Sequence, residues 1–215
     1  DKVIFNNLGL IIIDEQHRFG VEHRKLLIDK ALNPEILAMT ATPIPRTLSI
    51  TLHGDMDISI IDELPKNRLP INTKIVTPKM LPSIYKKIEK ELKKGGQCFI
   101  VYPLIEESEK LDLEASKSGY EKMKVIFDQF NVDYINGKMK KEEIDHKMRL
   151  MEKGEINCLI TTTVIEVGIN IPNATFMLVE NAERFGITQL HQLRGRIGRG
   201  TQQSYCVLVQ HKKTQ

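Results

Sequence analysis

LGLIIIDEQHRFG, residues 8–20, is the stretch of this sequence that decides the fold class. An apolar run over 8–13 leads directly into two carboxylates, Asp14 and Glu15. Continuous apolar strands are typical of parallel sheets, which present functional groups at the carboxyl ends of their strands. The stretch therefore predicts an α/β fold with acidic groups at one edge of a parallel sheet. Carboxylates in that position commonly hold a Mg²⁺ ion on a nucleotide phosphate, although a pair of solvated loop acids is the alternative.

Short apolar runs alternate with longer amphipathic stretches along the rest of the chain, which is the pattern of βα units. Strands are expected at 8–13, 36–39, 58–61, 97–102, 132–135, 157–161, 175–180 and 204–209. Helices are expected at 21–31, 44–53, 79–94, 113–130, 140–153 and 188–195. The helix over 79–94 has the clearest signal, because Ile84, Ile88 and Leu92 share one face and two glycines follow it.

The composition of the 215 residues, with 41% hydrophobic and 27% charged side chains, is typical of a globular protein. No apolar run approaches a membrane span, and no leader precedes the first strand, so we expect a cytoplasmic protein. The cysteines Cys98, Cys158 and Cys206 lie far apart in apolar runs and are expected to be buried free thiols. A net charge of +3 neither indicates nor excludes a nucleic-acid partner.

The segment DELPKNRLPIN, residues 62–72, contains two prolines and mixed charges, which is typical of a linker. We therefore expect a first piece over 1–65, a linker over 66–72 and a domain over 73–215. The first piece is too short to be a whole α/β domain.

Two threonine-rich stretches follow expected strands. In TATPIPRT, residues 40–47, hydroxyls could bond to the acids on the neighbouring strand, or the stretch could simply start a helix. In TTTVIEVGINIP, residues 161–172, hydroxyls and backbone N–H groups suit phosphate oxygens of a nucleotide or a nucleic-acid backbone. A plain polar strand end is the alternative there.

The stretch QLHQLRGRIGRG, residues 189–200, alternates glycines with arginines. Glycine permits close approach, and arginine supplies a planar, permanently charged fork for phosphate. Arg196 and Arg199, three residues apart on an irregular helix end, can both reach a developing phosphoryl charge. A generic basic loop is the alternative, but the spacing Q-x-x-G-R-x-G-R over 192–199 is much more specific than a charge run.

In their order, these four stretches resemble the motifs of superfamily 2 helicases, ATP-driven motors built of two RecA-like domains with ATP between them. DEQHRFGVEHR (14–24), IIDELPKNR (60–68) and PLIEESE (103–109) are more similar to the RecG branch, DNA helicases that remodel stalled forks and junctions in recombination and repair. The resemblance implies a RecA-like parallel sheet flanked by helices, as in P-loop NTPase helicase motor domains, with the first domain incomplete. It also implies ATP and Mg²⁺ as cofactors, branched DNA as partner, and a monomeric motor.

The resemblance assigns roles to residues of the first piece. Asp14 and Glu15 match the acids that serve magnesium binding and water activation. His17, Thr40 and Thr42 match the groups that couple the ATP state to domain closure.

The resemblance likewise assigns roles in the second piece. Gln192, Arg196 and Arg199 match residues that face ATP, with the arginines acting as fingers. Gly168 and Asn170 lie in the nucleotide-binding phrase, where the family usually has Asp in place of Asn170.

Thr161, Thr162 and Thr163 span the element that touches the DNA backbone in relatives. Lys138 is a further expected backbone contact. Asn136 stands where the family usually has His, which leaves a role for that side chain open.

A phosphate-binding loop of the form G-x-x-x-x-G-K-[ST] is missing from the sequence, because the only Gly-Lys pair is Gly137-Lys138. In the resembling family this loop precedes the acids. We therefore expect a fragment with half of an ATP site, inactive by itself. A non-catalytic module that binds nucleic acid or a partner is the alternative. A metal-dependent nuclease built on Asp14 and Glu15 is disfavoured, since such sites need more carboxylates.

Overall fold

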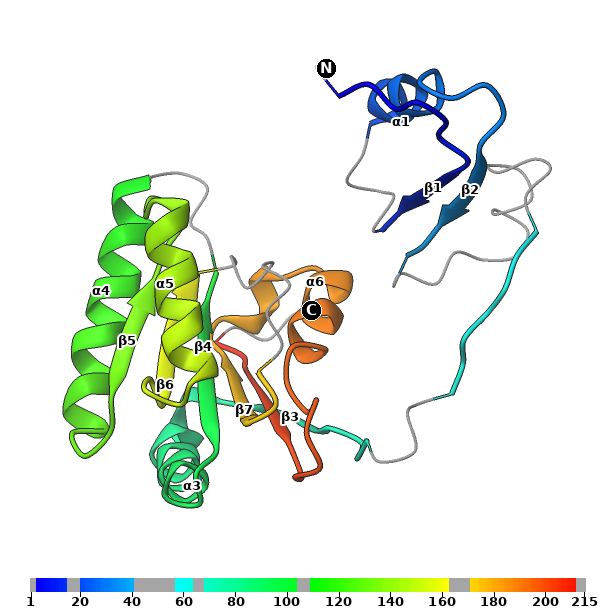
Figure 1. Cartoon of the computed structure of the whole chain (residues 1–215). Helices are drawn as coiled ribbons and strands as arrows, with labels where there is room; N and C mark the ends of the chain where they lie inside the picture. Colours follow the sequence, from blue (N-terminus) through cyan, green and yellow to red (C-terminus); the bar gives the residue numbers. More distant parts are fainter. Residues whose placement is uncertain are drawn as a thin grey trace. The chain divides into compact units, whose positions relative to one another are not determined.

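The structure, a computed structural model, describes residues 3–14, 20–40, 57–63, 68–103, 109–162 and 171–211. They belong to two compact units, residues 1–61 and 62–215, each with a parallel sheet of its own (Figure 1). Among the described residues there is no helix long and apolar enough to cross a membrane.

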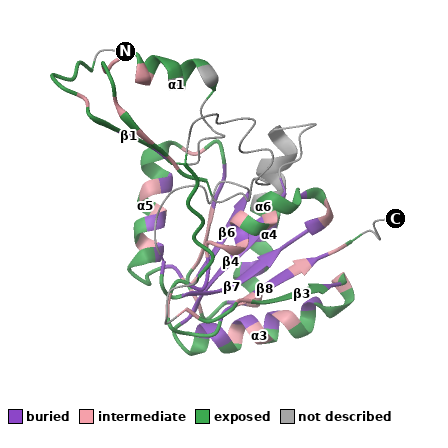
Figure 2. Cartoon of the chain, turned by 90° about the vertical axis from the view of Figure 1, so that its right-hand side faces the viewer, coloured by how far each residue is buried: buried purple, intermediate pink, exposed green. Residues whose placement is uncertain are grey.

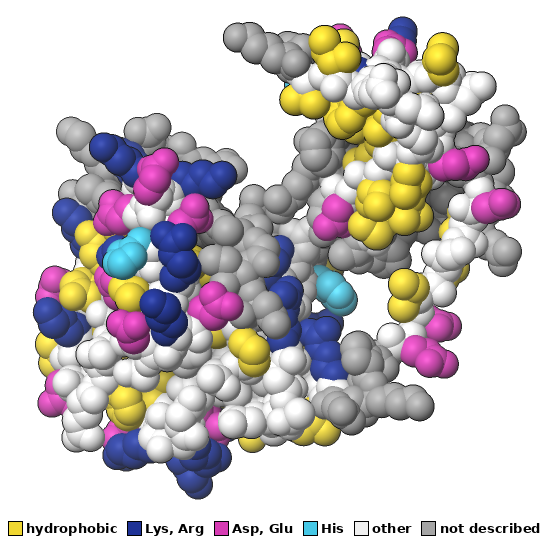
Figure 3. Space-filling view, in the orientation of Figure 1, with side chains coloured by type: hydrophobic (Ala, Val, Ile, Leu, Met, Phe, Trp, Pro, Cys, Tyr) yellow, Lys and Arg dark blue, Asp and Glu magenta, His cyan; other side chains and the backbone are white. Residues whose placement is uncertain are grey.

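The described residues of unit 1 form a two-stranded parallel sheet and one helix. Its elements are β1 (Leu10–Ile13), α1 (Val21–Ile28) and β2 (Glu35–Ala38). Ile11 and Ile13 are buried, whereas Leu10 and Ile12 on the other face of β1 are 54% and 56% exposed. In Figure 3, hydrophobic side chains gather on the surface of this unit. Within the described part of unit 1, one face of β1 is therefore buried and the other is exposed.

Unit 2 contains a six-stranded sheet in the order β3-β8-β7-β4-β6-β5, with every neighbouring pair parallel. Its strands are β3 (Asn72–Val76), β4 (Gln97–Tyr102), β5 (Val132–Ile135), β6 (Cys158–Thr162), β7 (Ala174–Val179) and β8 (Tyr205–Val209). Its helices are η2 (Pro78–Met80), α3 (Leu81–Lys93), α4 (Glu109–Ile126), α5 (Lys141–Glu152), η3 (Ala182–Arg184) and α6 (Ile187–Arg194).

Alternate residues of the central strands point to two separate hydrophobic cores. On β4, Phe99 and Val101 join the core under α5 and α6, and Cys98 and Ile100 join the core under α3 and α4. The central strands are therefore buried on both faces (Figure 2). The chain passes toward β5 by α3 and α4 and returns by α5 and α6 on the other face, which gives every helical crossover the same hand.

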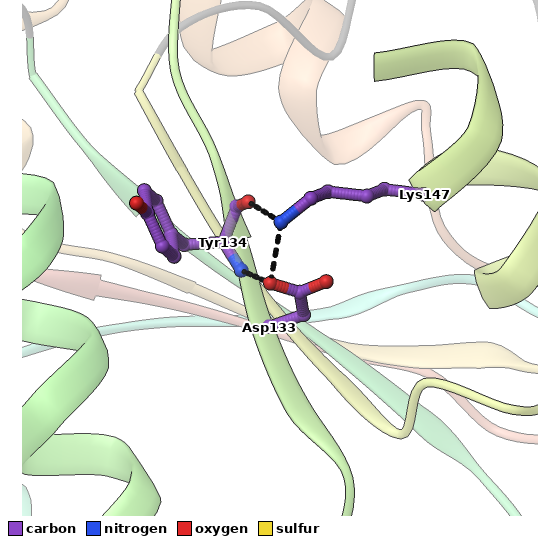
Figure 4. A network of polar contacts seen from close by, with 3 residues as sticks. All are labelled: Asp133, Tyr134 and Lys147. Carbon is purple, nitrogen blue, oxygen red and sulfur yellow. Dashed lines mark hydrogen bonds and ion pairs between the residues drawn. The ribbon is translucent and has the colours of Figure 1, made fainter. Parts of the chain in front are cut away.

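Polar contacts join helix α5 to the edge strand β5 (Figure 4). The Lys147 ammonium donates to Asp133 Oδ1 at 2.7 Å and to the Tyr134 carbonyl at 3.1 Å. Asp133 Oδ1 also accepts from the Tyr134 N–H at 2.7 Å. The Lys147 ammonium thus forms a hydrogen bond with a backbone carbonyl of the edge strand β5. Charged side chains in such positions discourage pairing with another chain.

Most of the predicted elements are confirmed to within a few residues, and the strands at 97–102 and 132–135 have the predicted bounds. The three cysteines are buried and free, as predicted. The predicted strand at 58–61 is wrong. Ile58, Ile60 and Ile61 are exposed and belong to no strand, so β-forming side chains alone do not produce a strand there. Strand β3 was not predicted, and the predicted helix at 44–53 lies outside the described residues.

Candidate functional site

Two candidate residues of unit 1 lie at the carboxyl edge of its sheet. Asp14 directly follows β1, and Thr40 follows β2 after one further residue. The Met39 N–H donates to the Ile13 carbonyl at 2.8 Å, which extends the pairing of the two strands to their ends. Both candidate residues are exposed there. The other candidates of this unit, Glu15, His17 and Thr42, lie outside the described residues.

In unit 2, two of the three predicted DNA-contacting threonines are buried. Thr161 and Thr162 end the inner strand β6 and are each 0% exposed. Thr161 Oγ1 donates to the Thr162 carbonyl at 2.7 Å, and Thr162 Oγ1 has no hydrogen-bond partner within the described part of the chain. Their side chains are therefore inaccessible to DNA in this arrangement. Thr163, Gly168 and Asn170 lie outside the described residues.

Lys138 lies in an ordered turn after the carboxyl end of β5. Asn136 Oδ1 accepts from the Lys138 N–H at 3.0 Å, and the Asn136 carbonyl accepts from the Met139 N–H at 3.3 Å. The Asn136 side chain is buried and fixes the turn, as Asn often does through its own backbone. Lys138 is exposed as a result, at the edge of the sheet where phosphate contacts were predicted.

The segment from 195 to 200, which we call the arginine loop, follows directly after α6. Gln192 on α6 and Arg196 in the loop are half-buried, and Ile197 is fully buried in the core. Arg199 is exposed, and its Nε donates to the Gly195 carbonyl at 3.3 Å. The buried Ile197 thus anchors the loop, with an arginine on each side.

Backbone conformation and close packing require glycine at two positions of the arginine loop. Gly198 has φ +68°, its N–H donates to the Ala174 carbonyl at 3.2 Å, and a Cβ there would lie 3.0 Å from Ile71 Cγ1. A Cβ on Gly200 would lie 2.6 Å from the Pro172 carbonyl oxygen. Only glycine permits both the left-handed backbone and the close approach. The glycines therefore shape the loop, and the arginines are available for chemistry.

Three arginines gather at this loop without an ion-pair partner among the described residues. Partial desolvation of the otherwise exposed Arg199 side chain, and then the neighbouring charges of Arg196 and Arg68, lower the pKa of Arg199. Arginine stays protonated at neutral pH, so the lowered pKa reflects first the desolvation of a charged guanidinium and then the repulsion between like charges. Such a cluster attracts an anion, and the guanidinium fork matches phosphate oxygens.

The structure thus separates the candidates of unit 2 into two groups. The arginine loop contacts Ala174 at the amino end of β7, whereas Thr162 and Lys138 lie at the carboxyl ends of β6 and β5. Arg68 is a member of the first group that the sequence analysis missed. It precedes Gly198 by 130 residues, and no sequence spacing could indicate their contact.

Comparison with known proteins identifies the relatives of this chain. Residues 79–201 match the helicase conserved C-terminal domain. The chain is 50% identical over 215 residues to the ATP-dependent DNA helicase RecG of Synechocystis sp., covering 100% of this chain and 26% of the relative. It is 54% identical over 213 residues to the ATP-dependent DNA helicase RecG of Aquifex aeolicus, covering 97% of this chain and 26% of the relative.

A solved structure of RecG bound to a three-way DNA junction is similar with a TM-score of 0.78 and 42% identity, covering 99% of this chain and 27% of that chain. The chain spans about a quarter of the length of these relatives. The predicted resemblance to RecG-type helicases is confirmed, and so is the predicted RecA-like parallel sheet flanked by helices. The matching residues run from η2 through the arginine loop and make up more than half of the chain. The chain therefore belongs to the helicase conserved C-terminal domain family.

Proposed function

We propose that this chain is part of an ATP-dependent DNA helicase that remodels branched DNA. The similarity to RecG bound to a three-way junction, at 42% identity over 99% of this chain, is the observation that supports this function most strongly. The alternative of a non-catalytic binding module is not favoured, because Arg196 and Arg199, whose guanidinium groups suit phosphate, lie within the matched helicase domain.

The described residues fit a nucleotide polyphosphate. The three arginines at the arginine loop have no carboxylate partner in the described part of unit 2, so a phosphate group would relieve their mutual repulsion. Hydrolysis of the γ-phosphate of ATP would supply the free energy for remodelling DNA. In our proposal Arg196 and Arg199 stabilise the charge that develops on the phosphate oxygens, and Gln192 orients the reacting groups. Gly168 and Asn170 contact the nucleotide.

The residues of unit 1 fit a magnesium ion that is held mainly by a nucleotide. No cluster of three or more potential metal ligands occurs among the described residues, but Mg²⁺ on a nucleotide needs only one or two protein carboxylates. We assign Asp14 to this ion and Glu15 to orienting the attacking water. His17, Thr40 and Thr42 transmit the state of the nucleotide to domain movement.

We place the DNA backbone contact on Lys138 and on the threonine triplet 161–163. Burial of Thr161 and Thr162 favours Lys138 and Thr163 as the direct contacts, with the first two threonines holding the strand end in shape. We further propose that the whole protein acts in recombination and repair as a cytoplasmic, monomeric motor. The boundaries 1–65, 66–72 and 73–215 stay our proposal for its domains in this region.

The test is ATP hydrolysis by the full-length protein with and without a three-way DNA junction. Arg199→Ala is expected to lower the DNA-stimulated kcat by about 10³-fold or more, because a finger arginine acts on transition-state charge. Glu15→Gln is expected to abolish turnover. Arg149→Met, on the exposed face of α5, is the matched control and should leave the rate unchanged. Undiminished hydrolysis by Glu15→Gln would overturn the assignment, and a wild-type protein that binds the junction without hydrolysing ATP would favour the binding module.

A further inference from the structure

We infer that Arg68 is a positioning residue for the arginine loop: it holds the backbone of that loop in the shape that directs Arg196 and Arg199 at phosphate. This inference rests on the proposed ATP hydrolysis and adds to it a residue outside the matched helicase domain, which begins at residue 79.

Two hydrogen bonds from Arg68 reach consecutive carbonyls of the arginine loop. Its Nε donates to the Gly198 carbonyl at 3.0 Å, and its Nη2 donates to the Ile197 carbonyl at 3.5 Å. A planar guanidinium can span two acceptors in this way, whereas an ammonium offers a single point charge. The two carbonyls flank the Gly198 residue with positive φ, so Arg68 fixes the part of the loop that turns into Arg199.

The segment that contains Arg68 is itself held against the rest of unit 2. The Gln203 side chain donates to the Pro70 carbonyl at 2.8 Å, and the Asn72 N–H donates to the Ser204 carbonyl at 2.9 Å. Ile71 packs on the core beside Gly198. Arg68 therefore reaches the loop from a fixed backbone, as a positioning group requires.

The charge of Arg68 also lies close enough to lower the pKa of Arg199. Two of the five N–H donors of Arg68 bind loop carbonyls, and from this geometry we assign Arg68 to act through the loop. Loss of Arg68 would leave Arg196 and Arg199 in the protein, but their side chains would be less well directed at phosphate. Misplacement of a reacting group by about 1 Å can cost about 100-fold in rate.

This role predicts a particular kinetic signature. A group that acts only on transition-state charge changes kcat, whereas uniform binding contributes to KM. In the full-length protein with a three-way junction, Arg68→Met should lower kcat for ATP hydrolysis about 10- to 100-fold and leave KM for ATP within about twofold. Arg68→Lys should be nearly as impaired as Arg68→Met, because it keeps the charge and loses the fork.

A double-mutant cycle separates positioning from general damage. If Arg68 acts through Arg199, adding Arg68→Met to Arg199→Ala should lower kcat by less than about threefold further, although Arg68→Met alone lowers it much more. Arg149→Met, again the matched control, should retain the wild-type rate, and thermal unfolding of each variant shows whether it is folded.

The outcomes distinguish the two proposals. A wild-type protein without DNA-stimulated ATP hydrolysis would overturn the proposed function. An active wild type with an unimpaired Arg68→Met would overturn the positioning role alone. Restoration of kcat by Arg68→Lys, or full additivity with Arg199→Ala, would likewise overturn it, since either result means that Arg68 acts by charge or independently of the loop.

Discussion

At the scale of single residues, the glycines and the arginines of the arginine loop have different roles. Gly198 and Gly200 permit the backbone to pass Ile71 and Pro172 closely, and Ile197 anchors the loop in the core. Arg196 and Arg199 contribute little to packing, because one is half-buried and the other exposed. Changes to the glycines should therefore affect folding, and changes to the arginines should affect chemistry.

Gly198→Ala should lower the free energy of unfolding by about 2 kcal/mol, because a left-handed non-glycine residue costs about 1–2 kcal/mol and the new Cβ crowds Ile71. Gly95→Ala is the matched control: Gly95 also has positive φ, at +85°, but no atom lies within 4 Å of a new Cβ. Urea unfolding of the 215-residue chain measures both. Equal losses would show that the approach to Ile71 adds nothing to the backbone strain.

At the scale of elements, Lys147 on α5 forms hydrogen bonds with β5 at one edge of the sheet of unit 2. Lys147→Met should lower the free energy of unfolding by about 1–2 kcal/mol, because it removes two hydrogen bonds from a charged, largely buried donor. Lys93→Met is the control, since its exposed i,i+4 pair with Glu89 is worth about 0.5 kcal/mol or less.

The same variant tests whether Lys147 protects the edge strand. Loss of the lysine frees the Tyr134 carbonyl, so the variant should self-associate more than Lys93→Met at equal concentration. Size-exclusion chromatography with light scattering measures this. A Lys147→Met protein as stable and as monomeric as the control would exclude both effects.

Elements were predictable where the sequence pattern matched the burial that the fold provides. The strand over 97–102 is apolar and buried on both faces, so its pattern was sufficient. Strand β3 escaped prediction because four of its five residues are exposed and its pattern lacks an apolar run. The predicted strand at 58–61 has the reverse error: it is apolar, but no described strand pairs with it.

At the scale of the whole molecule, sequence motifs predicted individual site residues but not how they group. Gln192, Arg196 and Arg199 were predicted from their motif and its resemblance to helicases, and Arg68 was not, because its contact with Gly198 spans 130 residues. The burial of Thr161 and Thr162 likewise depends on the position of β6 between β4 and β5, which local sequence does not specify.

The two units should differ sharply in their ability to fold alone. Residues 62–215 cover both faces of their sheet with helices, so this fragment should unfold cooperatively in urea. The described part of residues 1–61 has a two-stranded sheet with exposed Leu10 and Ile12, and isolated two-stranded sheets are marginal in water. That fragment should give a poorly dispersed amide NMR spectrum.

A shorter fragment, 73–215, tests where the second domain begins. It lacks Arg68, Pro70 and Ile71, which contact the arginine loop and its neighbours. If these contacts belong to the domain, 73–215 should be less stable than 62–215 by about 2 kcal/mol or more, because it loses the two hydrogen bonds of Arg68, those of Pro70 and Asn72, and the burial of Ile71. The loss should appear as a lower urea midpoint, with faster amide exchange at Ile197 and Gly198. Equal stability of the two fragments would instead support the boundary at residue 73 and would make the contacts of 68–71 incidental to folding.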